Sequence, residues 1–178
     1  FYDQIRLKKI IPVYDLIKIY KHGFFPMSES KFSHEVKFYK PKVRFVIPIN
    51  KFYVPKKLFR SFKNCKYNFK INFDFERVIS NCQQIKRKNT DTWINEIILN
   101  TYIKLFETKN CHSVECYEEE SLVGGLYGVH LGGCFFGESM FSTKSNTSKF
   151  CLLYLIAILK KNKFSLLDSQ FYNSHLTQ

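Results

Sequence analysis

Two polar side chains near the C-terminal end of the chain have the types needed to handle an amine. Asp168 and Gln170 lie two residues apart in LLDSQF, and on a strand this spacing places both side chains on one face. The acid can orient the amide by hydrogen bonding, and the amide oxygen can then hold a proton of an amine. Taken alone, the pair is more typical of an ordinary polar strand end than of a site.

Glu138 changes this interpretation, because it is the single acid in the apolar stretch FFGESMF. A buried carboxylate is costly unless it is paired or hydrogen-bonded. We therefore expect Glu138, on a neighbouring strand, to converge with Asp168 and Gln170. The apolar residues around the three polar groups are Phe135, Phe136, Met140, Leu152, Leu155 and Leu167. Polar groups that converge within an apolar surrounding are typical of a binding site.

Other site chemistries are not favoured by the sequence. The glycines of GGLYG and GGCFFG match neither GxGxxG nor a P-loop, and hairpin or close-packing roles explain them better. The turn STKSNTSK lacks the glycines of a CoA pyrophosphate loop. His112, His130 and His175 have no obvious metal partners, and none of the six cysteines forms a CxxC pair. We expect no metal, no cofactor, and reduced thiols that act as small apolar residues.

The positive charge of the chain is concentrated in its first part. The net charge is +13; residues 1–73 hold 17 Lys/Arg and 4 Asp/Glu, and residues 74–178 hold 11 of each. An AT-rich genome raises the lysine content of its proteins, but this bias would spread lysine along the chain without concentrating net charge. A polyanion such as nucleic acid is therefore the favoured partner. The expected anchors share one face of a helix that begins near Pro55: Lys56, Lys57, Arg60 and Lys63.

The hydrophobic pattern predicts a single α+β arrangement, with helices packed on a mostly antiparallel sheet. Predicted helices cover residues 13–23, 74–86, 93–108 and 147–161, and predicted strands cover 42–49, 67–73, 112–119, 121–141 (as a hairpin) and 164–172. We expect a small basic N-terminal region at 1–66 and a catalytic domain at 67–178. No apolar run approaches the roughly 20 residues of a membrane span, so no membrane partner is expected.

Seven motifs occur in an order that carries a family resemblance: HGFFPM, DTWIN, HSVECY, LVGGLYGV, FFGESMFS, SNTSK and LLDSQF. From about Tyr14 onward the chain resembles the leucyl/phenylalanyl-tRNA–protein transferases. The resemblance implies a monomeric, cytoplasmic bacterial enzyme that moves Leu, Phe or Met from aminoacyl-tRNA to proteins with N-terminal Arg or Lys. The product enters N-degron proteolysis. The implied fold is a small N-terminal domain plus an acetyltransferase-like (GNAT-type) domain that uses no acetyl-CoA.

The resemblance also implies residue roles. Glu138 would lie at the edge of an apolar pocket for the aminoacyl side chain, Asp168 would orient Gln170, and Gln170 would hold the α-amine of the acceptor. The pocket residues would be Leu126, Phe135, Met140, Leu152, Leu155, Leu159 and Leu167. The 3′ adenosine and the acceptor would meet Tyr20, Met27, Trp93, Tyr102 and Asn173. Many family members have Trp at the position of Met27, which here keeps apolar contact but offers no flat stacking face.

Alternatives to this activity stay open at the level of sequence. A non-catalytic RNA-binding protein would keep the fold and the basic face, although Glu138, Asp168 and Gln170 together argue for an enzyme. A CoA-dependent N-acetyltransferase would have to bind acetyl-CoA, which the glycine-free turn does not favour. Related systems add leucine to acidic N-termini, so the acceptor class is also open.

Overall fold

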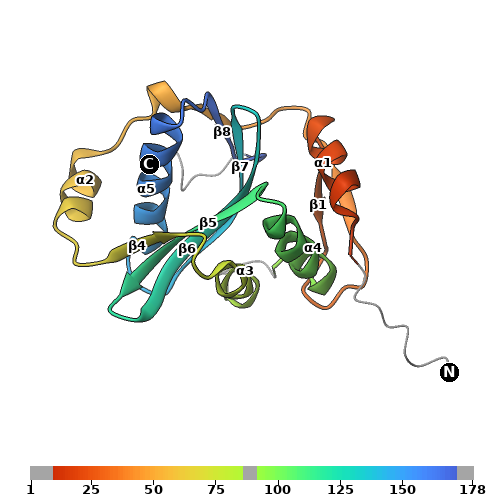
Figure 1. The fold of residues 1–178 in the computed structure, drawn as a ribbon, viewed down its shortest axis with the longest axis horizontal. Helices are drawn as coiled ribbons and strands as arrows, with labels where there is room; N and C mark the ends of the chain where they lie inside the picture. Colours follow the sequence, from red (N-terminus) through yellow and green to blue (C-terminus); the bar gives the residue numbers. More distant parts are fainter. Residues whose placement is uncertain (1–9, 86–91, 172–178) are drawn as a thin grey trace.

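A six-stranded sheet forms the centre of the computed structural model, which describes residues 10–85 and 92–171 (Figure 1). The strand order is β3-β8-β7-β6-β5-β4. The strands are β3 (Val46–Pro48), β4 (Asn68–Ile71), β5 (Cys111–Glu118), β6 (Ser121–Leu131), β7 (Cys134–Ser142) and β8 (Leu166–Asp168). Neighbouring strands are antiparallel except β7 and β8, which are parallel. The predicted α+β class with a mostly antiparallel sheet is confirmed.

Helix α5 (Thr147–Lys161) connects the parallel strands β7 and β8 and covers one face of the sheet (Figure 1). It has the predicted bounds, because a long apolar run bounded by polar residues defines both of its ends. Its first turn approaches β6 closely: a Cβ on Gly124 would lie 2.5 Å from Thr147 Oγ1. Thr147 Oγ1 also donates to the Val123 carbonyl at 2.9 Å. Glycine at 124 therefore lets the helix dock directly on the strand.

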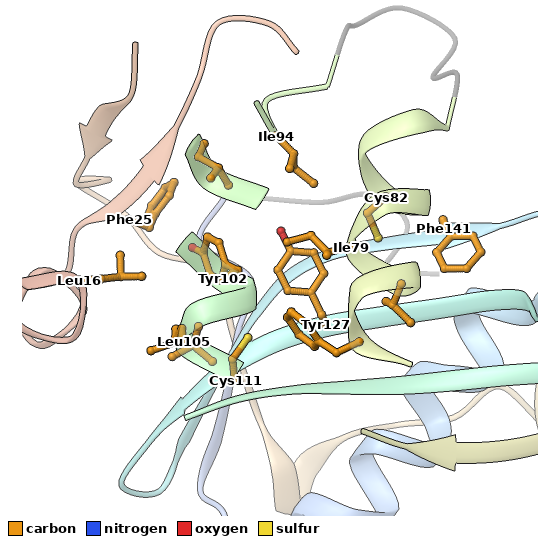
Figure 2. Close-up of a cluster of buried hydrophobic side chains, with 14 of the residues drawn as sticks. Leu16, Phe25, Ile79, Cys82, Ile94, Tyr102, Leu105, Cys111, Tyr127 and Phe141 are labelled. Carbon is orange, nitrogen blue, oxygen red and sulfur yellow. The ribbon is translucent and has the colours of Figure 1, made fainter. Parts of the chain in front are cut away.

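The opposite face of the sheet is covered by α3 (Phe75–Gln84) and α4 (Glu96–Glu107), with α1 (Val13–Lys21) packed outside α4. Strand alternation separates the two cores, since Cys111 and Tyr127 face α3 and α4 whereas Val114 and Cys116 face α5. Figure 2 shows the core on the α3/α4 side, where side chains from α1, α3, α4 and the sheet meet. This packing brings α1 and α4 to the strand that carries Glu138.

The N-terminal part adds three smaller elements and a 3₁₀ turn. Strands β1 (Phe25–Met27) and β2 (Lys37–Tyr39) form a separate antiparallel pair, and η1 (Ile49–Lys51) precedes α2 (Lys56–Lys63). Pro26 lies within β1, which is one strand of a two-stranded pair and therefore an edge strand, where proline is tolerated. The division into 1–66 and 67–178 remains a prediction; β3, from the first segment, pairs with β8.

Several predicted bounds shift. The second helix of the α3/α4 layer begins at Glu96 rather than at Trp93, because the Asn95 side chain accepts a hydrogen bond from Ile98 N and caps it. Asp74 is the N-cap residue of α3, as predicted, but among described residues its side chain forms no capping bond. Instead, the Glu115 carboxylate accepts from the Phe73 and Asp74 amides at 3.2 and 3.4 Å.

The six cysteines, all within described residues, form no disulfide. No helix in residues 10–85 and 92–171 is long and apolar enough to cross a membrane.

Candidate active site

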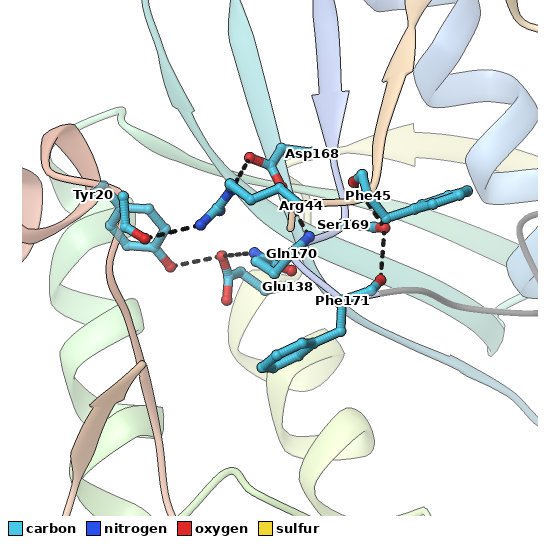
Figure 3. A network of polar contacts seen from close by, with 9 residues as sticks. Tyr20, Arg44, Phe45, Glu138, Asp168, Ser169, Gln170 and Phe171 are labelled. Atoms are coloured by element: carbon cyan, nitrogen blue, oxygen red, sulfur yellow. Dashed lines mark hydrogen bonds and ion pairs between the residues drawn. The ribbon is translucent and has the colours of Figure 1, made fainter. Parts of the chain in front are cut away.

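Glu138 on β7 is the centre of a polar network, and Figure 3 shows its contacts with Tyr20 and Gln170. Tyr20 of α1 donates to Glu138 Oε1 at 2.6 Å, and Tyr102 of α4 donates to Oε2 at 3.2 Å. The two tyrosyl oxygens also contact each other, and because each hydroxyl has one proton, a bond between them uses the proton of one tyrosine in place of its bond to Glu138. Gln170, which follows β8, donates its side-chain amide to Glu138 Oε1 at 3.0 Å. One carboxylate therefore faces three donor groups from α1, α4 and the end of β8.

The surroundings of Glu138 change how readily it ionises. Burial raises the pKa of its carboxyl to about 7, although the hydrogen bonds from Tyr20 and Tyr102 act in the opposite direction. Burial and the nearby Glu138 charge raise the pKa of both tyrosines well above the usual value. The tyrosines therefore remain hydrogen-bond donors, whereas Glu138 changes its charge near neutral pH. A group that titrates close to the working pH is suited to proton transfer.

Asp168, which is only 5% exposed, lies on the other side of Gln170. Its Oδ1 accepts from the Gln170 backbone N–H at 2.8 Å, and its Oδ2 accepts from Arg44 Nε at 2.8 Å. The predicted contact between Asp168 and the side-chain amide of Gln170 is not the one observed: Asp168 holds the backbone N–H of Gln170, and the side-chain amide donates to Glu138. The reason is that β8 ends at Asp168 and Gln170 has a φ of +61°, so the two residues do not share a strand face.

The predicted side-chain pocket residues all belong to the core between the sheet and α5. Six of them are buried there and Met140 packs against them: Leu126, Phe135, Leu152, Leu155, Leu159, Leu167 and Met140. Phe135 and Met140 lie on β7, the strand of Glu138, and Leu167 lies on β8 next to Asp168. The apolar set therefore lies together in the core on the α5 side of the sheet, whereas Tyr20 and Tyr102 of the Glu138 network belong to the core on the opposite side.

The residues predicted to meet adenosine and acceptor are divided. Tyr20 and Tyr102 are buried members of the Glu138 network. Met27 and Trp93 are half-buried against the α3/α4-side core, and the Ser28 amide, next to Met27, donates to the Trp93 carbonyl at 3.0 Å. These two apolar side chains therefore come from neighbouring segments. Asn173 lies outside the described residues.

The basic residues on α2 have the predicted arrangement. Lys56, Lys57, Arg60 and Lys63 are all exposed on one helix, which Pro55 precedes directly. Within the described residues no ion pair involves these four side chains. The other side of the helix is attached through Phe62, whose ring lies 5.3 Å from Phe69 of β4 and 5.7 Å from Phe150 of α5. The charges therefore face solvent from a docked helix.

Sequence reasoning missed Arg44. It lies just before β3, and its guanidinium also donates through Nη1 to the Gly23 carbonyl at 2.9 Å. The sequence signal was weak, since Arg44 is one cation among many in a basic segment.

The histidines were not expected to bind a metal. His112 and His130 are hydrogen-bonded to each other at 2.8 Å, and His175 is not among the described residues. No cluster of three or more metal-ligating side chains occurs in residues 10–85 and 92–171.

Comparison with known proteins shows which family the chain resembles. Residues 46–178 match the family described as leucyl/phenylalanyl-tRNA protein transferase. Proteins given that name in Hyphomonas neptunium and Caulobacter vibrioides are each 43% identical to 92% of this chain. The chain spans 64% of the Hyphomonas protein and 76% of the Caulobacter protein. Among solved structures, the C-terminal domain of a putative lysylphosphatidylglycerol synthetase from Agrobacterium fabrum is 9% identical, with a TM-score of 0.48 over 92% of this chain and 53% of that one.

Proposed function

The chain belongs to the leucyl/phenylalanyl-tRNA–protein transferase family, and from this premise we propose that it moves Leu, Phe or Met from aminoacyl-tRNA to the N-terminal Arg or Lys of proteins. The product would be a protein marked for N-degron proteolysis. The observation that carries the proposal is the contact between Gln170 Nε2 and Glu138 Oε1 at 3.0 Å, which joins the end of β8 to β7.

This contact fixes the orientation of the Gln170 amide. An ionised carboxylate only accepts hydrogen bonds, so the NH₂ group of the amide must point to Glu138 and the oxygen must point away. The oxygen is then available to accept a hydrogen from the α-amine of an acceptor. Since protonated Glu138 could donate to the amide oxygen instead, the orientation depends on the ionisation of Glu138.

The proposed reaction is aminolysis of an ester. The neutral α-amine attacks the carbonyl carbon of the aminoacyl ester, a C–N bond forms, and the bond from that carbon to the 3′ oxygen of the terminal adenosine breaks. The amine loses one proton and the 3′ oxygen gains one. Glu138, with a pKa of about 7, is suited to take the proton from the amine. Alignment of an already activated ester would supply most of the remaining acceleration.

The apolar residues of β6, β7, β8 and α5 support the choice of aminoacyl group. A pocket built from Leu126, Leu155, Leu159 and their neighbours would accept Leu, Phe and Met and would reject polar side chains through the cost of desolvation. Discrimination among the apolar substrates would be modest, because one methylene contributes only about 1–3 kcal/mol. The exposed cations of α2 would bind the tRNA phosphates.

The test is transfer of labelled Leu from Leu-tRNA to peptides that differ only at the N-terminus: Arg, Lys, Asp, Glu and acetylated Arg. We expect label on the Arg and Lys peptides only. A parallel reaction with labelled Asp-tRNA should give no product. Label on the Asp and Glu peptides would reverse the acceptor class, and tRNA binding without any transfer would favour a non-catalytic RNA-binding protein.

A further inference from the structure

Arg44 joins two parts of the molecule that each hold one partner of Glu138. Its Nε donates to Asp168 Oδ2 at 2.8 Å, and its Nη1 donates to the Gly23 carbonyl at 2.9 Å (Figure 3). Gly23 follows α1, the helix that carries Tyr20, and Asp168 ends β8, the strand that precedes Gln170. The guanidinium thus lies between the elements that supply two donors to the same carboxylate.

The side chain of Arg44 is well defined by its surroundings. Only 23% of it is exposed, and its Asp168 partner is 7% exposed, so the ion pair is largely removed from water. The guanidinium carbon also lies 5.7 Å from the centre of the Phe25 ring. A planar guanidinium with two directed hydrogen bonds and an aromatic contact fixes position as well as charge, which a lysine ammonium does less well.

The backbone next to Arg44 also holds the segment that follows Asp168. Phe45 N donates to the Gln170 carbonyl at 3.2 Å, and Ser169 N donates to the Phe45 carbonyl at 3.0 Å. Gln170 needs this support, because its φ of +61° is one that a non-glycine residue rarely adopts without constraint. Its backbone N–H is held by Asp168 Oδ1, whose other oxygen is held by Arg44.

We infer that Arg44 is a positioning residue for aminoacyl transfer: it fixes Asp168, Asp168 fixes the backbone of Gln170, and Gln170 then presents its amide to Glu138 and to the attacking amine. The same guanidinium ties the end of α1 to this segment, so that Tyr20 and Gln170 reach Glu138 together. This role rests on the proposed function for its chemistry, and on the contacts of Arg44 for its geometry.

The decisive variants are Arg44→Met, which removes charge and both hydrogen bonds, and Arg44→Lys, which keeps the charge but not the two-pronged geometry. The matched control is Arg77→Met, because Arg77 also pairs with an aspartate, Asp74, at 3.8 Å, but on the exposed surface of α3. Single-turnover transfer, binding of Leu-tRNA and backbone amide hydrogen exchange are measured for each variant.

We expect Arg44→Met to lower the transfer rate about 100-fold, the loss typical of misplaced reacting groups, and to change the Kd for Leu-tRNA less than about threefold. Arg44→Lys should retain part of the rate, about tenfold below the unmodified chain, because it restores charge without fixed geometry. Exchange at residues 168–171 should become faster in Arg44→Met and stay unchanged in Arg77→Met.

A residue that acts through Gln170 has a further signature. The double variant Arg44→Met/Gln170→Ala should transfer no more slowly than Gln170→Ala alone, because residues that act as a unit are not additive. The inference would be overturned if the rate losses of the two single variants multiplied in the double variant, or if Arg44→Met kept the full transfer rate. If the unmodified chain transfers no aminoacyl group, the proposed function fails, and unchanged exchange at 168–171 in Arg44→Met would separately refute the positioning role.

Discussion

The polar network around Glu138 and the basic face of α2 use charged residues in opposite ways. Around Glu138 the ionisable groups are buried or half-buried, and each contacts specific partners at 2.6–3.2 Å. On α2 the charges are exposed, and no described residue forms an ion pair with them. In the network the positions of the atoms matter, whereas on α2 the number of charges matters. The first arrangement suits chemistry, and the second suits attraction of a polyanion.

The largest effect should come from Gln170→Ala. Removing the amide leaves Glu138 without one donor and the amine without its acceptor, so the transfer rate should fall about 100- to 1,000-fold, as for other groups that bind a reacting atom. The Kd for Leu-tRNA should stay within about threefold, because the phosphate contacts are elsewhere. Gln83→Ala is the matched control, since Gln83 also donates to a glutamate, Glu96, at 3.2 Å, but outside the network. An equal loss in the control would show a general structural effect.

The second largest effect should be that of Glu138→Gln on the transfer rate and on its pH dependence. In the unmodified chain the transfer rate should rise with pH through about 7, where Glu138 ionises, and again as the acceptor amine loses its proton. The variant should be about 10- to 100-fold slower at pH 8, because a neutral amide takes no proton, and should lack the lower inflection. A variant that keeps this inflection would remove Glu138 from the chemistry.

The same substitution changes the stability of the fold in a defined direction. Because the pKa of Glu138 rises from 4.5 on folding to about 7, the folded chain binds the proton more tightly than the unfolded chain. This contribution, up to about 3 kcal/mol, is complete below pH 4.5 and is lost as the pH rises through 7. Chemical denaturation at several pH values should show this decline in the unmodified chain and a flatter profile in Glu138→Gln. Equal profiles would contradict a carboxyl whose pKa is raised by its surroundings in the fold.

A smaller effect is expected on the basic face. Neutralising Lys56 and Arg60 to Gln should weaken binding of Leu-tRNA about tenfold at low salt and reduce the salt dependence of log K by about 2. The transfer rate at saturating Leu-tRNA should not change. Glu76→Gln and Glu107→Gln, which alter exposed charges on α3 and α4, are suitable controls. An unchanged salt dependence would move the tRNA surface away from α2.

The smallest effect should come from Phe62→Ala, which keeps every charge on α2 but removes its contacts with Phe69 and Phe150. If charge alone matters, binding of Leu-tRNA should weaken only about twofold, since the helix can still present its cations. A loss as large as that of the Lys56/Arg60 variant would show that the docked position of α2 matters too. Salt titrations of the two variants separate these outcomes.

The sequence was sufficient where a long pattern repeats and insufficient where one residue decides. The bounds of α5 follow from a long apolar run with polar residues at both ends, and the buried face of α3 follows from apolar periodicity. Gln170 was expected to continue a strand, but its positive φ turns the chain after Asp168. Arg44 was missed because its partner Asp168 is 124 residues away in sequence, and many other cations lie near Arg44 in the chain. The convergence of Glu138, Asp168 and Gln170 was predictable because acids are rare in such apolar surroundings.

The most direct test compares Gln170→Ala with the Lys56→Gln/Arg60→Gln variant in single-turnover transfer of labelled Leu to an N-terminal Arg peptide, as enzyme concentration and salt are varied. We predict that Gln170→Ala stays slow at every enzyme concentration and salt, whereas the α2 variant reaches the full rate at high enzyme concentration. The opposite pattern, with Gln170→Ala restored by more enzyme or the α2 variant slow at saturation, would contradict the division between a buried catalytic network and an exposed tRNA-binding helix.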